Sequence, residues 1–133
     1  MEKADNKEGS FASLAGINIV TADPKKLADF YKNILGAEID ETRGGPNRIE
    51  IWLGSPDERR VYIAANYDKD FIYRKYNACQ GFELLVDDVD SHYNRIMQLG
   101  IEISAPPVNL PWGYRYFNIK DPDGNGIDIV QAI

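Results

Sequence analysis

Hydrophobic and polar residues alternate in short stretches of this chain, and two helical patterns interrupt the alternation. Ile17 and Ile19 alternate with small or polar neighbours, as in a strand. Asp23 and Pro24 then favour a helix start, because aspartate caps free N–H groups and proline suits the first helical position. Apolar residues recur at helical spacing up to Gly36, which is a natural C-terminal stop. The chain therefore begins with a predicted strand and a predicted helix.

The same reasoning predicts seven more strands and a second helix along the chain. Clusters of glycine, proline, serine and aspartate separate the strands of the first half. In the second half, Asp88 is placed to cap a helix that Gly100 would end. The strands are expected near residues 37–42, 47–53, 60–65, 81–86, 101–105, 114–119 and 126–131, and the second helix over 88–99.

Two stretches of the chain repeat one another. A glycine-led strand, a capped helix and a Leu-Gly pair occur in both halves, with 65 residues from Gly16 to Gly81 and 64 from Leu35 to Leu99. Such self-similarity indicates two copies of one structural unit. Each copy has the order βαβββ, which predicts an α+β fold of two tandem βαβββ modules. The modules are expected over roughly residues 12–66 and 79–133, as a single domain at 12–133, with a connection near 66–78.

Alternation within the strands also assigns side chains to faces. Ile49 and Ile51 should face the helices, whereas Arg48, Glu50 and Trp52 should lie on the opposite face. The helix-free faces combine large aromatic residues with acidic residues, and a face exposed only to water is expected to carry more lysine. This combination favours two sheets that curl around a small-molecule cleft, although a plain solvated face is the alternative.

Composition and charge narrow the possible partners. The 133 residues suffice for one domain with a real core, while the polar residues 1–11 are expected to form a disordered tail. The net charge of −6, without a basic run, argues against nucleic-acid binding and against binding to anionic membranes. No apolar run approaches the roughly 20 residues of a membrane span. The single cysteine, Cys79, cannot form an internal disulfide, which favours the cytoplasm.

The order of these motifs resembles the vicinal oxygen chelate superfamily, which includes glyoxalase I, bleomycin and fosfomycin resistance proteins and extradiol dioxygenases. The resemblance covers roughly residues 12–133 and is closest to bleomycin resistance proteins. It rests on the Asp-Pro to Phe-Tyr stretch from Asp23, the Val-Asp-Asp-Val run from Val86, the Pro-Trp-Gly run from Pro111 and the Asp-Pro-Asp-Gly-Asn run from Asp121. The resemblance implies the glyoxalase/bleomycin resistance fold with a curved mixed-sheet cleft.

The resemblance also implies where metal ligands would stand. Metal-dependent members place histidine or another ligand on the first strand of a copy and glutamate on its last strand. The first-strand positions, seven residues before each helix-capping aspartate, are Gly16 and Gly81, and the last-strand position is Asp128. Since glycine offers no ligand, neither a metal nor another cofactor is expected. The alternative is a weak oxygen cage of Asn18, Glu83 and Asp128, better suited to hard cations.

The segment from Pro111 to Tyr116 is the best positive clue to function. It resembles the part of bleomycin resistance proteins where tryptophan and glycine lie at the mouth of the drug cleft. One indole and two phenols offer flat walls for a planar or cationic ligand, and nearby carboxylates could pair with its charge. Trp112 could instead only cover the end of the sheet, and Glu50 could pair with Arg48. The expected ligand-binding residues are Trp112, Trp52, Tyr114, Tyr116, Asn18, Glu50, Glu83 and Asp128.

These observations predict a metal-independent binding protein that holds an aromatic or cationic small molecule, and the resemblance implies that it is a homodimer. One alternative is a metal-dependent lyase, isomerase or dioxygenase of the same superfamily with degenerate ligands. A second alternative is a dimeric interaction module. No catalytic residue is assigned, because the lone histidine, His92, is expected on a helix surface or edge, and Cys79 has no histidine nearby in the sequence.

Overall fold

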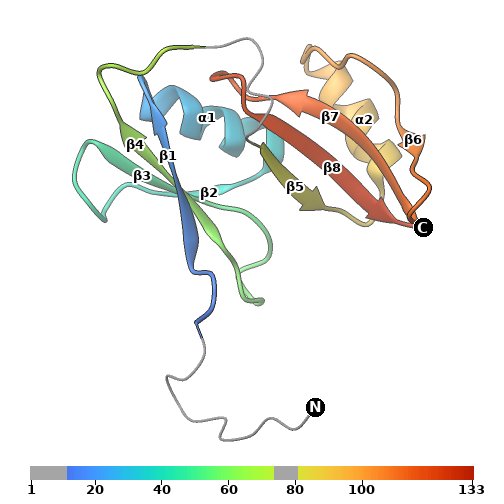
Figure 1. Cartoon of the computed structure of the whole chain (residues 1–133), viewed down its shortest axis with the longest axis horizontal. Coiled ribbons are helices and arrows are strands. Elements are labelled where there is room, and N and C mark those ends of the chain that lie inside the picture. Colours follow the sequence, from blue (N-terminus) through green and yellow to red (C-terminus); the bar gives the residue numbers. More distant parts are fainter. Residues whose placement is uncertain (1–11, 74–80) are drawn as a thin grey trace, which may run out of the picture.

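A computed structural model describes residues 12–73 and 81–133 of the chain. The expected N-terminal tail and Cys79 lie outside the described residues. Within them, two four-stranded sheets and two helices follow one another in two similar units (Figure 1). The expected α+β fold of two tandem βαβββ modules is therefore confirmed.

The first module forms a mixed sheet with strand order β1-β4-β3-β2. Its first strand pairs with its last in parallel, and the other neighbours are antiparallel. The elements are β1 (Gly16–Thr21), α1 (Pro24–Leu35), β2 (Glu38–Asp40), β3 (Arg48–Trp52) and β4 (Tyr62–Tyr67).

The second module repeats this arrangement with strand order β5-β8-β7-β6. Its elements are β5 (Gly81–Leu85), α2 (Val89–Gln98), β6 (Val108–Asn109), β7 (Tyr114–Lys120) and β8 (Gly126–Ala132). The parallel pair β5–β8 corresponds to β1–β4 of the first module. Equivalent positions of the two modules can therefore be compared by strand register.

Each helix begins at the aspartate that the sequence indicates. The Asp23 side chain accepts a hydrogen bond from the Lys26 backbone N–H at 3.0 Å, and the Asp88 side chain accepts one from Ser91 at 3.2 Å. Gly36 ends α1 in the left-handed region at φ 71°, where a side chain would be strained. The capping residues therefore fix where both helices begin and where α1 ends.

One predicted strand is wrong. Residues 101–105 form no strand, and the edge strand β6 lies further along the chain, paired with Arg115 and Tyr116 of β7. Ile101 and Ile103 pack against the core, and this burial produces the apolar alternation without a neighbouring strand. A long connection after α2 thus replaces the short step from α1 to β2.

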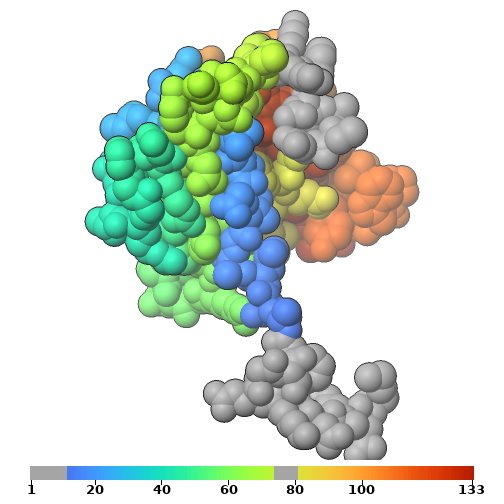
Figure 2. Space-filling view, turned by 60° about the vertical axis from the view of Figure 1, so that its left-hand side comes forward, coloured from blue at the N-terminus to red at the C-terminus, as the bar shows by residue number. Residues whose placement is uncertain are grey.

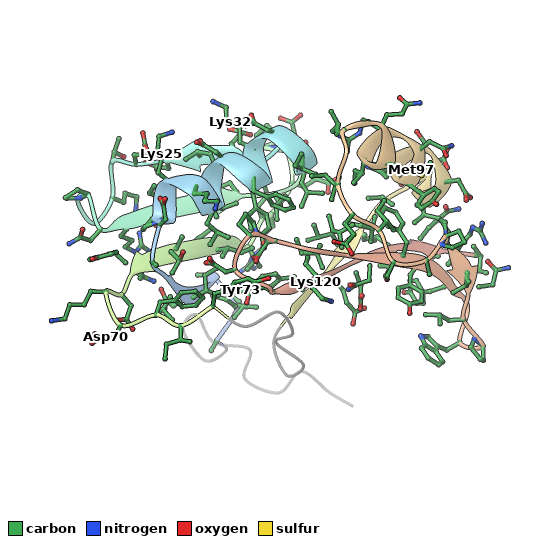
Figure 3. The ribbon with its side chains drawn as sticks, turned by 90° about the horizontal axis from the view of Figure 1, so that it is seen from above. Lys25, Lys32, Asp70, Tyr73, Met97 and Lys120 are labelled. Atoms are coloured by element: carbon green, nitrogen blue, oxygen red, sulfur yellow. The ribbon has the colours of Figure 1, made fainter. Side chains whose placement is uncertain are left out.

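Both helices cover the same side of the two sheets, and Figure 3 labels Lys25 and Lys32 on the outer side of α1. Apolar side chains from both modules meet in one continuous core between helices and sheets, with Leu27, Tyr31, Ile51, Ile96 and Phe117 among its buried members. No helix among the described residues is long and apolar enough to cross a membrane.

The Asp-Pro-Asp-Gly-Asn turn between β7 and β8 also joins the modules. Asp121 is buried, and its Oδ2 accepts a hydrogen bond at 2.8 Å from the Tyr31 hydroxyl of α1. The same carboxylate accepts the backbone N–H groups of Asp123 and Asn125 at 2.9 and 3.0 Å and the Asn125 side-chain amide at 2.9 Å. A motif that reads as a turn in the sequence is therefore also a contact between the two halves.

Candidate functional site

The eight expected ligand-binding residues fall into three places. Trp52 and Glu50 lie on the helix-free face of the first sheet, whereas Asn18 lies on the edge strand β1. The other five line one groove on the second sheet: Glu83, Trp112, Tyr114, Tyr116 and Asp128. The structure thus gathers most of the set, but not all of it, into a single site.

On the first sheet, Glu50 is covered by its neighbours. It is 0% exposed, although it lies on the face without helices. Its Oε2 accepts a hydrogen bond from Arg48 Nη1 at 2.5 Å, and its Oε1 accepts one from Trp52 Nε1 at 3.2 Å, with Arg43 Nη1 3.4 Å away. A buried carboxylate needs such partners. Glu50 is therefore engaged within the protein.

The Tyr62 side chain covers the rest of the helix-free face of the first sheet. Its ring lies 5.0 Å from the Trp52 ring, and the guanidinium groups of Arg43 and Arg48 lie 5.9 and 5.6 Å from its centre. The opposite strand accommodates the ring with a glycine, since a Cβ on Gly16 would lie 2.5 Å from the nearest ring carbon. The first module therefore presents a filled aromatic and cationic surface.

The second module presents an open groove of about 660 Å³. Trp112 is 70% exposed at the turn before β7, while Tyr114 and Tyr116 follow on the helix-free face of that strand. Leu110, Asn118 and Val130 complete the lining together with the five expected residues. Three aromatic side chains thus surround a space with few but strongly polar groups, which is typical of small-molecule sites. We call this space the groove.

Two carboxylates lie side by side on the groove wall. Glu83 of β5 stands directly opposite Asp128 of β8 in the parallel pair. Asp128 accepts a hydrogen bond from the Asn118 amide at 2.8 Å, and Asn118 in turn accepts one from Lys120 at 2.8 Å. Among the described residues, the Glu83 carboxylate has neither an ion pair nor a hydrogen bond. The groove therefore offers an uncompensated negative charge beside aromatic rings.

Asn18 is separate from this pair of carboxylates. It accepts a hydrogen bond from Asn66 at 3.3 Å and lines a different cavity, between β1 and the start of β5, with Val20 and Gly81. Figure 2 shows these two strands, blue and yellow, next to each other on one face. The cage of Asn18 with Glu83 and Asp128 is thus spread over two cavities.

The residues present do not fit the metal site of the family. The strand register places Ala64 of β4 where β8 has Asp128, so Gly16, Gly81 and Ala64 stand at three of the four positions at which the resemblance implies metal ligands. The two glycines are also sterically closed, because a Cβ on Gly81 would lie 2.6 Å from the carbonyl oxygen of Gly126. No group of three His, Cys, Asp or Glu side chains in the described parts of the chain could hold an ion. The residues at three of these positions therefore offer no side-chain donor atom to a metal.

Some residues that shape the site escape inspection of the sequence alone. Arg43 lies in a glycine-rich loop, and only the fold brings it over Tyr62 and Glu50. Asn118 lies on a strand face already marked as polar, so alternation together with the partner Asp128 could have indicated it. Ala64 could not be singled out in the sequence, because it matters only in having no side-chain donor where Asp128 stands in the second module.

Comparison with known proteins agrees with this architecture. Uncharacterized protein YwbC of Bacillus subtilis is 28% identical over 118 residues, which cover 85% of this chain and 92% of the relative. Uncharacterized protein YraH of the same organism is 24% identical over 129 residues, covering 90% and 98%. A superfamily member from Sphaerobacter thermophilus superposes with a TM-score of 0.70 at 26% identity, covering 91% of this chain and 98% of its own. Virulence protein STM3117 from Salmonella typhimurium shares the fold, with a TM-score of 0.71 at 20% identity and coverage of 92% and 98%.

The family model extends over nearly all of both modules. It matches residues 13–129, from the residues before β1 to the middle of β8. The chain belongs to the Glyoxalase/Bleomycin resistance protein/Dioxygenase superfamily.

Proposed function

We propose that this protein binds a planar organic cation in the groove without the help of a metal. The observation that carries the proposal is the unpaired Glu83 carboxylate beside Asp128, on a wall shared with Trp112, Tyr114 and Tyr116. Aromatic rings attract cations through their negative faces, and a carboxylate beside the rings adds a charge–charge attraction. Sequestration of such a molecule needs no catalytic group.

The first module supports metal independence by its construction. The Tyr62 ring takes the space in front of Gly16, and Trp52, Arg43 and Arg48 surround that ring. A metal ligand introduced at this position would first have to displace a packed aromatic residue. Because the carboxylate of this face, Glu50, is already bonded to Arg48, the negative charge open to a ligand lies in the second module.

A homodimer is part of the proposal. Large apolar side chains are exposed at the groove, with Trp112 at 70% and Tyr114 at 38%, and on the edge strands β1 and β5, with Val20 at 51% and Leu85 at 71%. Exposed apolar side chains of this size favour burial against a partner. A second copy would shelter them and enclose the ligand. The low cysteine content is compatible with a cytoplasmic protein.

Tryptophan fluorescence tests the proposal directly. The protein is titrated with N-methylacridinium, a fixed planar cation, and with acridine at a pH where acridine is neutral. Two single-tryptophan variants, Trp52→Phe and Trp112→Phe, report which indole is quenched by energy transfer or contact. We expect saturable binding of the cation, stronger quenching of Trp112, and weaker binding of the neutral ring.

The variant Glu83→Gln removes the charge without changing the size of the side chain. It should weaken cation binding by about tenfold, equivalent to about 1.4 kcal/mol, and leave binding of acridine unchanged. Equal affinity for the cation and the neutral ring, or no effect of Glu83→Gln, would overturn the proposal. Binding only after a divalent ion is added would favour the metal-dependent alternative.

A further inference from the structure

Two corresponding contacts join the modules, each between a helix of one module and a strand connection of the other. Only the first contact contains a network of hydrogen bonds among the described residues. At the first, α1 contacts the β7–β8 turn through the buried Tyr31–Asp121 hydrogen bond. At the second, α2 faces the longer connection between β3 and β4. This connection contains residues 53–61, and residues 54–59 are all exposed. The approximate symmetry of the repeat is therefore broken where the modules touch.

A cavity of about 680 Å³ occupies the second contact. Its apolar wall comes from both modules, with Leu35, Leu53 and Val61 on one side and Leu84, Leu85 and Val86 on the other. Its polar rim consists of Glu58, Arg59, Arg60, His92 and Glu83. We call this space the inter-module cavity. It is distinct from the groove, although Glu83 borders both.

The helix position that faces this cavity differs between the modules. Leu27 stands four residues after the capping Asp23 and is buried in the core at 1% exposure. His92 stands four residues after the capping Asp88 but is only half-buried, and it lines the cavity. Its Nδ1 lies 3.4 Å from an Arg95 guanidinium nitrogen, which leaves Nε2 to carry the proton and act as a donor. A polar group thus replaces a core leucine at the cavity.

Most of the charges on the rim form no ion pair among the described residues. Arg59 donates a hydrogen bond to the neutral Ser13 hydroxyl and forms no ion pair among the described residues. Glu58 and Glu83 likewise form no ion pair in the described parts of the chain, whereas Arg60 pairs with Glu38 at 2.8 Å. One free cation and two free anions therefore border one apolar space.

We propose that the inter-module cavity binds a zwitterion with an apolar body, namely a hydrophobic dipeptide. The ligand carboxylate would lie at Arg59, with His92 as a second donor, and the ammonium group at Glu58. Apolar side chains would occupy the wall formed by Leu53, Val61 and Leu85. A zwitterion would pair with rim charges of both signs, whereas a simple cation or a simple anion would pair with charges of one sign only. The proposal does not depend on the function proposed for the groove.

Calorimetric titration of the full chain with leucyl-phenylalanine provides the test, compared with the same dipeptide N-acetylated and C-amidated. We expect the free dipeptide to bind and the doubly blocked one to bind at least tenfold more weakly. The variants Arg59→Gln and Glu58→Gln should each weaken binding by about twofold to fivefold, because each removes one ionic partner at an exposed site. Lys69→Gln, which removes an exposed charge elsewhere, is the matched control and should leave the affinity unchanged.

A third variant, Val61→Trp, fills the cavity from its exposed edge and should abolish dipeptide binding without unfolding the protein, as monitored by circular dichroism. Trp112→Phe should change acridinium binding but not dipeptide binding, which separates the two sites. Equal binding of the blocked dipeptide would overturn the proposal. So would unchanged affinity in Arg59→Gln, or loss of dipeptide binding in Trp112→Phe instead.

Discussion

The buried hydrogen bond between Tyr31 and Asp121 permits a quantitative prediction about the contact between the modules. Tyr31→Phe deletes one hydroxyl and leaves the ring in the core. Burial, followed by the charge of Asp121, raises the pKa of Tyr31 well above its ordinary value, so the phenol is a protonated donor at neutral pH. The donor-to-acceptor distance of 2.8 Å is that of a strong hydrogen bond to a charged group.

Hydrogen bonds to charged groups contribute about 1.5–3 kcal/mol net. Asp121 retains three other donors from Asp123 and Asn125, so the variant leaves the carboxylate weakened but still bonded. We therefore expect Tyr31→Phe to lower the free energy of unfolding by about 2 kcal/mol. For a domain of this size, this corresponds to a fall in melting temperature of roughly 5–8 °C.

Urea unfolding followed by circular dichroism measures the difference, with the slope of the transition as a check on two-state behaviour. Tyr93→Phe is the matched control, since Tyr93 is a half-buried tyrosine of α2 that packs against Phe117 and makes no hydrogen bond through its hydroxyl with another described residue. A double-mutant cycle with Asp121→Asn isolates the pair and should give a coupling of about 1–2 kcal/mol. A loss below about 0.5 kcal/mol in Tyr31→Phe, equal to that in Tyr93→Phe, would show that the hydrogen bond does not stabilise the contact.

Three further predictions concern steric fit, charge and exposure. Gly16→Ala should lower the free energy of unfolding by about 1–3 kcal/mol, because its methyl group would overlap the Tyr62 ring. In urea unfolding, Gly16→Ala should cost little further stability when it is introduced into a chain that already carries Tyr62→Ala. Burial, followed by the neighbouring Asp121 charge, raises the pKa of Asp123, so protonation of Asp123 stabilises the fold. Asp123→Asn should therefore unfold at a higher temperature than the parent protein at pH 7. In thermal unfolding scans, this difference in stability should shrink as the pH falls through the raised pKa of Asp123, and a difference that stays constant with pH would contradict the prediction. Trp112→Ala should weaken acridinium binding at least fivefold but change the melting temperature by less than about 2 °C, since the side chain is 70% exposed, and a large loss of stability would show that it belongs to the core.

Most of the fold could be predicted from local patterns. The capping aspartates mark the start of each helix, and the periodic apolar residues give correct elements because they also pack in the common core. The strand expected at residues 101–105 fails because alternation reports burial, and Ile101 and Ile103 are half-buried against the core without a pairing partner. Pairing depends on a neighbouring strand, which no local pattern contains.

The site could be predicted only in part. The aromatic run after Pro111 and the two carboxylates on adjacent strands do line one groove, because strand alternation puts them on the same face. The placement of Glu50 in a covered cluster depends on Arg43, which reaches it from a loop. The conflict between Gly16 and the Tyr62 ring depends on register across two strands 46 residues apart. Such long-range contacts carry no signal in a single sequence.

Metal-free binding in the groove is the property on which the proposed function depends, and one experiment addresses it. The purified protein is analysed for bound metals, dialysed against a chelator, and titrated with N-methylacridinium before and after addition of Zn²⁺, Ni²⁺, Mn²⁺ or Fe²⁺. We expect no stoichiometric ion, no rise in melting temperature with any of the four ions, and the same affinity throughout. An ion that is bound stoichiometrically, lost in Asp128→Ala and required for ligand binding would show that the groove is a metal site.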